Sequence, residues 1–139
     1  VLEISKWIRI VPENPGPAAI AALVQRHEEK KNICRVKRGS EWFAWRYHPN
    51  SDRDYRWTAV YDGAELTGIG IWRFDPTTRR AFLCELIGNA QSIGIVLNFV
   101  LSDAYREKAR VLDFPTNDPV LIPILKSHGF MRKYDSRFV

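Results

Sequence analysis

The spacing of hydrophobic and polar positions changes several times along the chain, and each change predicts a new element. Residues 1–11 alternate and are rich in β-branched side chains, which predicts a strand that ends at the Pro/Gly cluster of residues 12–17. From residue 18 to about residue 32, apolar side chains recur at helical spacing, which predicts an amphipathic helix. A short second helix is expected over residues 40–47, with Ser40 as its N-cap.

Three strands are predicted in the middle of the chain. Residues 54–61 and 64–74 flank the turn dipeptide Asp62-Gly63, which is a strong hairpin signal. The turn of residues 75–78 leads to a third strand over residues 79–87. We therefore expect an antiparallel meander.

The helical period returns after the meander. Apolar side chains at helical spacing from residue 93 predict a helix that runs to about residue 109, and residues 110–114 are expected to form a short strand. A final helix is expected to begin near Pro119 and to stop at Gly129. Residues 131–139 are expected to be extended. The order is β-α-α-β-β-β-α-β-α-β, which predicts a three-layer α+β fold with a mixed, mostly antiparallel sheet flanked by helices.

Composition adds limits to this picture. The 139 residues suit one domain, and 21 Lys and Arg against 16 Asp and Glu give a net charge of +5. The longest apolar run is about half of the ~20 residues that a membrane-spanning helix needs. Cys34 and Cys84 form no zinc-binding spacing, so we expect no metal site and a reducing, cytoplasmic location. Because residue 1 is not methionine, residues 1–139 are interpreted as one domain of a longer chain.

Several short motifs stand at the junctions of these elements. Three of these motifs resemble motifs of the GNAT superfamily of acyl-CoA-dependent N-acetyltransferases. The hairpin of residues 62–68 resembles the turn into the family's third strand, and the junction of residues 86–96 resembles its pyrophosphate loop. The ending of residues 125–130 resembles its closing helix and Gly-Phe. Residues 45–49 resemble the second half of tandem GNAT proteins. The resemblance covers nearly the whole chain. It implies acetyl transfer from acetyl-CoA to an amine, with a sister GNAT domain or a second copy as a partner.

The resemblance also implies where the diphosphate of the coenzyme binds. A helix N-terminus offers free N–H groups and a partial positive charge, and small residues allow close approach. Gln91 and Gly94 match the family pattern Gln/Arg-x-x-Gly-x-Gly/Ala, whereas the branched Val96 stands at the second small position, where it is expected to block close approach. A shifted register would use Asn89, Ser92 and Gly94 instead. The implied cofactor-binding residues are Leu86, Ile87, Gly88, Gln91, Ser92, Ile93 and Gly94.

The acyl group is expected where the strands of residues 79–87 and 110–114 splay apart. Parallel neighbours that separate expose free backbone donors, and one N–H near Leu86 would polarise the thioester carbonyl.

Two side chains are candidates for the proton transfers that the reaction needs. Glu85 is the candidate base, because alternation with Leu83 and Ile87 puts its carboxylate on an apolar face, where desolvation favours proton uptake. In many relatives the acid is a Tyr four residues before the Gly-Phe glycine. Leu125 occupies that position here and cannot donate a proton, so Tyr134 is the candidate acid.

Other interpretations of the same residues stay open. Glu85 would otherwise pair across the sheet with Arg79, Arg80 or Arg73, and residues 91–94 would otherwise be an ordinary helix start. Arg35, Lys37 and Arg38 are expected to form an exposed basic loop.

Two further functions compete with acetyl transfer. One is a non-catalytic, structural or regulatory GNAT-like half-domain that packs on a sister domain or binds acyl-CoA without turnover. The other is nucleic-acid binding, suggested by interleaved aromatic and basic residues. It is not expected, because +5 is modest and no nucleic-acid motif is present.

Overall fold

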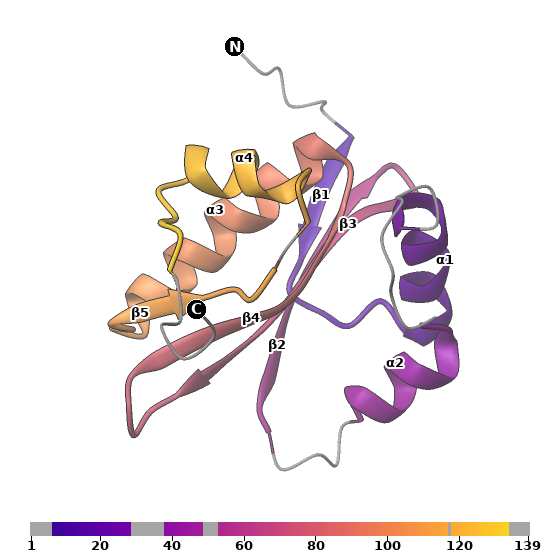
Figure 1. The fold of residues 1–139 in the computed structure, drawn as a ribbon. Coiled ribbons are helices and arrows are strands. Elements are labelled where there is room, and N and C mark those ends of the chain that lie inside the picture. Colours follow the sequence, from indigo (N-terminus) through magenta and orange to yellow (C-terminus); the bar gives the residue numbers. More distant parts are fainter. Residues whose placement is uncertain (1–6, 29–37, 49–52, 117, 134–139) are drawn as a thin grey trace.

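A five-stranded sheet runs through the middle of the molecule, and helices cover both of its faces (Figure 1). The structure is a computed structural model, and it describes residues 7–28, 38–48, 53–116 and 118–133. The elements follow one another as β1 (Ile8–Val11), α1 (Pro17–Glu28), α2 (Ser40–Arg46), β2 (Tyr55–Asp62), β3 (Glu65–Asp75), β4 (Arg80–Gly88), α3 (Ala90–Arg106), β5 (Val111–Asp113) and α4 (Leu121–Ser127). The predicted α+β fold with a mixed, mostly antiparallel sheet is confirmed.

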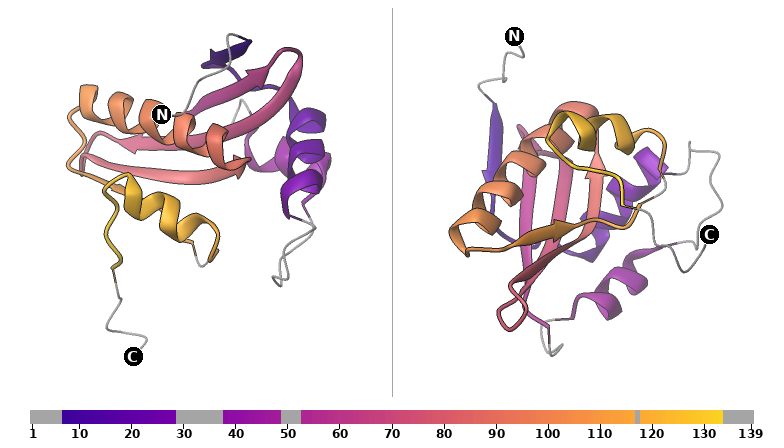
Figure 2. Two further views of the ribbon diagram at one scale, coloured as in Figure 1. Left: turned by 90° about the horizontal axis from the view of Figure 1, so that it is seen from above. Right: turned by 60° about the vertical axis from the view of Figure 1, so that its left-hand side comes forward.

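The strands lie in the sheet in their sequence order, β1-β2-β3-β4-β5. The first three pairings are antiparallel, so the predicted meander is present, and β4 pairs with β5 in parallel. A parallel pair needs a long crossover connection, and α3 supplies it. Figure 2 shows α3 running along one face of the sheet as the chain passes from β4 to β5.

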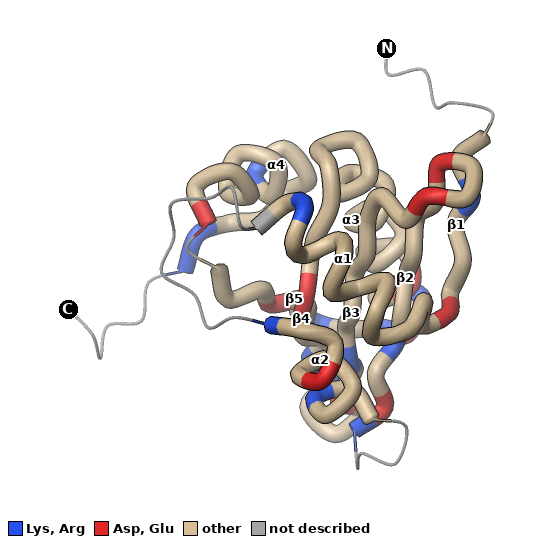
Figure 3. The backbone as a smooth tube through the Cα atoms, turned by 90° about the vertical axis from the view of Figure 1, so that its right-hand side faces the viewer, with Lys and Arg blue, Asp and Glu red and all other residues tan. Residues whose placement is uncertain are grey.

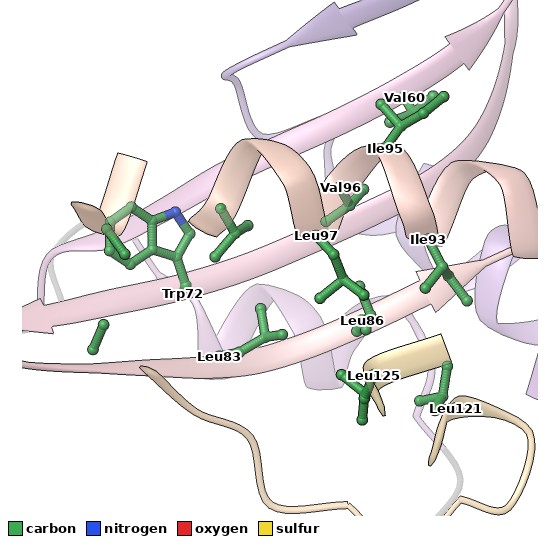
Figure 4. Close-up of a cluster of buried hydrophobic side chains, with 13 residues drawn as sticks. Val60, Trp72, Leu83, Leu86, Ile93, Ile95, Val96, Leu97, Leu121 and Leu125 are labelled. Carbon is green, nitrogen blue, oxygen red and sulfur yellow. The ribbon is translucent and has the colours of Figure 1, made fainter. Parts of the chain in front are cut away.

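The sheet separates two hydrophobic cores. The α3/α4 core lies between the sheet and helices α3 and α4, and it contains Trp72, Leu83, Val96 and Leu97 (Figure 4). The α1/α2 core lies on the other face, where Ile20, Leu23 and Phe43 pack on β2, β3 and β4. The helical spacing of the buried residues on α1 and α3 explains why each helix turns one face to the sheet.

Several predicted boundaries moved. The hairpin turn is centred on Gly63 and Ala64, one residue later than Asp62-Gly63, and Gly63 takes the positive φ of 61°. Gly39 is the N-cap of α2, so Ser40 is its first helical residue. The predicted last strand is absent over 131–133, and its remainder lies outside the described residues.

None of the described helices combines the length and the apolar character that crossing a membrane requires.

Candidate active site

The pairing between β4 and β5 ends early. It joins Arg80 to Val111, Ala81 to Leu112 and Phe82 to Asp113, and no described strand pairs with the rest of β4 on that side. The main chain of β4 from residue 83 to residue 88 is therefore an open edge next to β5. This edge includes Leu86, whose N–H is the candidate donor to the acyl carbonyl.

A β-bulge follows directly after the last β4–β5 pair. Opposite β3, Ile71 faces Glu85 while Trp72 faces Leu83, so Cys84 is an extra residue in β4. A bulge bends its strand and increases the local twist, which accounts for the divergence of β4 from β5 at this point. Cys84 itself is half-buried, and burial raises the pKa of its thiol.

The bulge also corrects one prediction about faces. Regular alternation would put Leu83, Glu85 and Ile87 on one side of the sheet. In the structure Leu83 belongs to the α3/α4 core, whereas Glu85 and Ile87 lie on the α1/α2 face. The reason is that one inserted residue shifts the phase of alternation by one position.

Helix α3 starts immediately beyond the open edge. Only Asn89 separates β4 from α3, and its side chain accepts a hydrogen bond of 2.8 Å from the Ser92 amide. The Ile93 amide donates to the Asn89 carbonyl at 2.9 Å. Among the described residues, the amides of Ala90 and Gln91 have no such partner, as expected for the first turn of a helix. These two donors fit a phosphate group.

Gly88 lets β4 turn into α3 close to β3. Its φ is 151°, and a Cβ at this position would lie 2.5 Å from the Thr67 carbonyl oxygen. Ser92 donates from its hydroxyl to Thr67 Oγ1 at 2.8 Å, so the start of α3 is bonded to β3. The contacts at Gly88 and Ser92 hold the helix N-terminus beside the open edge.

Val96 does not obstruct the first turn of α3. The side chain is fully buried, and a Cβ on Gly70 would lie only 2.4 Å from Val96 Cγ1. Val96 therefore packs against β3, away from the free amides. The expected obstruction assumed a loop before the helix, and the structure has only one residue there.

Gly94 faces α4. A Cβ on Gly94 would be 3.7 Å from His128 Cε1 and 3.8 Å from Nε2, an ordinary contact distance. His128 Nδ1 lies 2.9 Å from the Ile124 carbonyl oxygen, which fixes the ring at the end of α4. The structure thus brings Gly88, Gln91, Ser92, Ile93 and Gly94 together at the start of α3, with Leu86 and Ile87 on the strand that leads into it.

Glu85 is held by two groups from the α2 region. Tyr47 donates its hydroxyl hydrogen bond to Glu85 Oε1 at 2.8 Å, and Arg38 Nη1 lies 2.6 Å from Oε2. Glu85 is 7% exposed, and the Arg38 side chain is 14% exposed. The expected ion pair of Glu85 is therefore present, but its partner is Arg38 and not an arginine of the sheet.

The roles of Arg38 and Tyr47 were missed by the sequence interpretation. Arg38 is mostly buried instead of exposed, while Arg35 and Lys37 lie outside the described residues. Tyr47 packs edge-on against Tyr55 and Trp57, at ring distances of 4.8 and 5.5 Å. Burial raises the pKa of the Tyr47 hydroxyl, and the Glu85 carboxylate raises it further. The four-residue spacing of Phe43 and Tyr47 was the available signal that Tyr47 faces the sheet.

The candidate acid lies outside the described residues, because these end at residue 133 before Tyr134. Leu125 is buried in the α3/α4 core. In the described part of the chain, no three His, Cys, Asp or Glu side chains gather in a way that could hold a metal ion.

Two basic residues that alternate with aromatic ones along the chain, Arg46 and Arg56, make contacts within the protein. Arg46 donates to the Tyr55 hydroxyl at 2.6 Å, and Arg56 pairs with Glu107 at 2.5 Å. Charges of both signs are interspersed around α1 and α2 (Figure 3).

The comparisons with known proteins rest on the fold. No family model matches the sequence, and no curated protein is similar to it in sequence. An aminoglycoside acetyltransferase from an uncultured soil metagenomic sample has a TM-score of 0.69 at 10% identity, with 96% of this chain and 94% of that chain covered. An acetyltransferase from Trypanosoma brucei has a TM-score of 0.67 at 7% identity (93% and 96% covered). A transcriptional regulator from Bacillus halodurans has a TM-score of 0.69 at 11% identity (93% and 96% covered).

These similarities show that the chain shares its fold with acetyltransferases and with a transcriptional regulator over more than nine tenths of its length. The chain has the GNAT-type acetyltransferase fold over nearly its whole length, as the sequence resemblance predicted.

Proposed function

We propose that the chain is an acyltransferase domain that transfers an acetyl group from acetyl-CoA to an amine. The observation that carries the proposal is the end of β4–β5 pairing at Phe82 and Asp113. It leaves an open strand edge that leads directly to the N-terminus of α3, in a fold shared with acetyltransferases over more than nine tenths of the chain.

The binding groups follow from this arrangement. Leu86, Ile87 and Gly88 line the open edge, where the acyl-bearing arm of acetyl-CoA would lie. The free amide of Gln91 would donate to the diphosphate, together with that of Ala90. Ser92 and Ile93 build the first helical turn that presents these amides, and Gly94 leaves space beside it.

The reaction needs one bond to form and one to break. The amine nitrogen attacks the thioester carbonyl carbon, so a C–N bond forms as the C–S bond breaks and its electron pair leaves on sulfur. The N–H near Leu86 would donate to the carbonyl oxygen, where negative charge develops. The acceptor ammonium loses two protons in all: one would pass to Glu85 before the attack, and the second leaves the nitrogen for water as the C–S bond breaks. Tyr134 would supply a proton to the thiolate and regain one from water.

Thermal denaturation with and without acetyl-CoA tests binding. A ligand at 100 times its Kd stabilises the folded state by about 2.7 kcal/mol, which corresponds to a rise in Tm of several degrees. Absence of any shift at millimolar acetyl-CoA would rule out the proposed enzyme.

Two variants with an added carboxylate locate the site. Ala90→Asp puts the charge at the first residue of α3, where it suits the helix dipole but repels a diphosphate, so the fold should stay stable while the acetyl-CoA shift is lost. Gly94→Asp should also abolish the shift. Ser40→Asp is the matched control, because it makes a similar change at the first residue of α2. An equal loss of the shift in Ser40→Asp would contradict the location.

Turnover is measured as release of the free thiol in the presence of an amine. Glu85→Gln should leave acetyl-CoA binding intact and remove turnover, when it is assayed well below its own Tm. An unchanged rate in this variant would exclude Glu85 as the base.

A second candidate function is a non-catalytic half-domain that packs on a sister domain or binds acyl-CoA without turnover. The observation in its favour is that Glu85 is already bonded to Arg38 and Tyr47. Acetyl-CoA binding without thiol release for any amine would support this candidate over the transferase.

A further inference from the structure

A cavity of about 700 Å³ lies between β5, α4 and the chain that follows α4. Its volume is within the range of small-molecule sites, which is roughly 300–1,000 Å³. Phe82 and Asp113, the last residue pair between β4 and β5, are part of its wall. The cavity therefore reaches the point at which the open edge of β4 begins.

The inner wall of the cavity is mainly apolar. Leu112 and Phe114 contribute from β5 and the chain beyond it, Ile122 and Leu125 from α4, and Phe130 from the following segment. A ligand that fills this space would gain most from an apolar group, because such a group removes the apolar wall from contact with water.

The charges around the cavity are mostly positive. Lys126, Arg132 and Lys133 are exposed and line it. Among the described residues that line it, Asp113 is the one carboxylate, and it is paired with Arg80. Behind the wall, the Arg73 guanidinium lies 4.3 Å from the centre of the Phe82 ring. A ligand with only a positive charge would be repelled by this arrangement, whereas a negative group would be attracted.

We propose that this cavity is the acceptor subsite, and that it selects a small amine that carries a carboxylate and an apolar side chain, the chemistry of an apolar amino acid. The apolar part lies against Leu112 and Ile122, and the carboxylate lies near Lys126 and Lys133. The amine then lies toward Phe82, next to the open edge of β4. This inference rests on the proposed transfer to an amine.

The binding test compares L-phenylalanine with L-phenylalaninamide, which has the same ring and amine but lacks the carboxylate. Ligand-observed NMR or calorimetry without acetyl-CoA should give a Kd about tenfold lower for phenylalanine, the difference expected from one hydrogen bond to a charged group. Equal affinities for the two ligands, or no binding of either, would overturn the proposal.

Variants tie the preference to the cavity. Lys126→Gln combined with Lys133→Gln should remove the preference for phenylalanine, because both changes remove charge without altering the apolar wall. Arg106→Gln is the control, since it removes one charge from an exposed position on α3 outside the cavity wall. Ile122→Trp should fill the cavity and abolish binding of both ligands in a variant whose folding is verified by its Tm. Retention of the preference in the double lysine variant would place the ligand elsewhere.

The acetyl-CoA titration separates this inference from the proposed function. A carboxylate preference that depends on Lys126 and Lys133, found together with no response to acetyl-CoA, would overturn acetyl transfer but leave the ligand class of the cavity intact. Acetyl-CoA binding without any carboxylate preference would overturn the subsite alone.

Discussion

Replacing Glu85 by Gln tests how much the buried contacts of this carboxylate stabilise the fold. The amide can still accept from the Tyr47 hydroxyl, but it loses the charge that faces Arg38 at 2.6 Å. Because both side chains of the ion pair are largely buried, Arg38 is left without this carboxylate in a poorly solvated place. Breaking a buried pair from one side costs roughly 3–5 kcal/mol, and the remaining Tyr47 contact puts the expectation at about 3 kcal/mol.

Urea and thermal denaturation measure this loss. At about 4 °C per kcal/mol for a domain of this size, the Tm of Glu85→Gln should fall by roughly 12 °C. The double variant Arg38→Met/Glu85→Gln should be within about 1 kcal/mol of the unmodified protein, because it removes both charges while the amide still accepts from the Tyr47 hydroxyl. Asp103→Asn is the control, since it breaks an exposed pair with Arg106 and should cost under about 0.5 kcal/mol.

The reasoning is refuted if Glu85→Gln costs no more than Asp103→Asn. It is also refuted if the double variant is as unstable as the sum of its two single variants, because the cost would then not come from an unpaired charge.

Two further predictions concern Tyr47 and the packing of α3. The pKa of Tyr47 is raised in the folded state, so the stability that this hydroxyl contributes is fully present below its unfolded pKa of about 10 and is lost as the pH rises above that value. Above about pH 10, the free energy of unfolding should therefore fall by about 1.4 kcal/mol per pH unit more in the unmodified protein than in Tyr47→Phe. Parallel pH profiles of the two proteins would contradict the raised pKa. Gly70→Ala should lower the free energy of unfolding by about 1–3 kcal/mol, because the added Cβ would lie 2.4 Å from Val96 Cγ1. In denaturation measurements, Val96→Ala should destabilise the Gly70→Ala variant less than it destabilises the unmodified protein. Gly39→Ala is the control, because the space around its Cβ is open.

The order and type of most elements could be predicted because, within each element, apolar residues recur at the spacing typical of a helix or of a strand. The buried positions of α3, such as Ile93, Val96, Leu97 and Val100, follow the helical spacing read from the sequence. From residue 40 onward, the element ends differ from the predicted ones by up to three residues. The position of the turn at Gly63, for example, depends on how β2 and β3 pair, and the dipeptide Asp62-Gly63 does not reveal that register.

The candidate site was harder to predict because it depends on contacts between distant residues. Arg38 and Glu85 are 47 positions apart, and no local pattern links them. The connection between β4 and α3 was expected to be a loop, but it is the single residue Asn89, whose side chain closes the first turn of the helix. The positions of the predicted residues near Gly94 depend on this short connection.

Cys84 shows that one bulged residue can decide the chemistry of a surface. If Cys84 took a regular place in the pairing with β3, Glu85 would fall on the same side as Leu83, and the only carboxylate of β4 would have to enter the apolar core beneath α3. The acidic character of the opposite side thus depends on the bulge, and a substitution at Glu85 is only one of two ways to lose it.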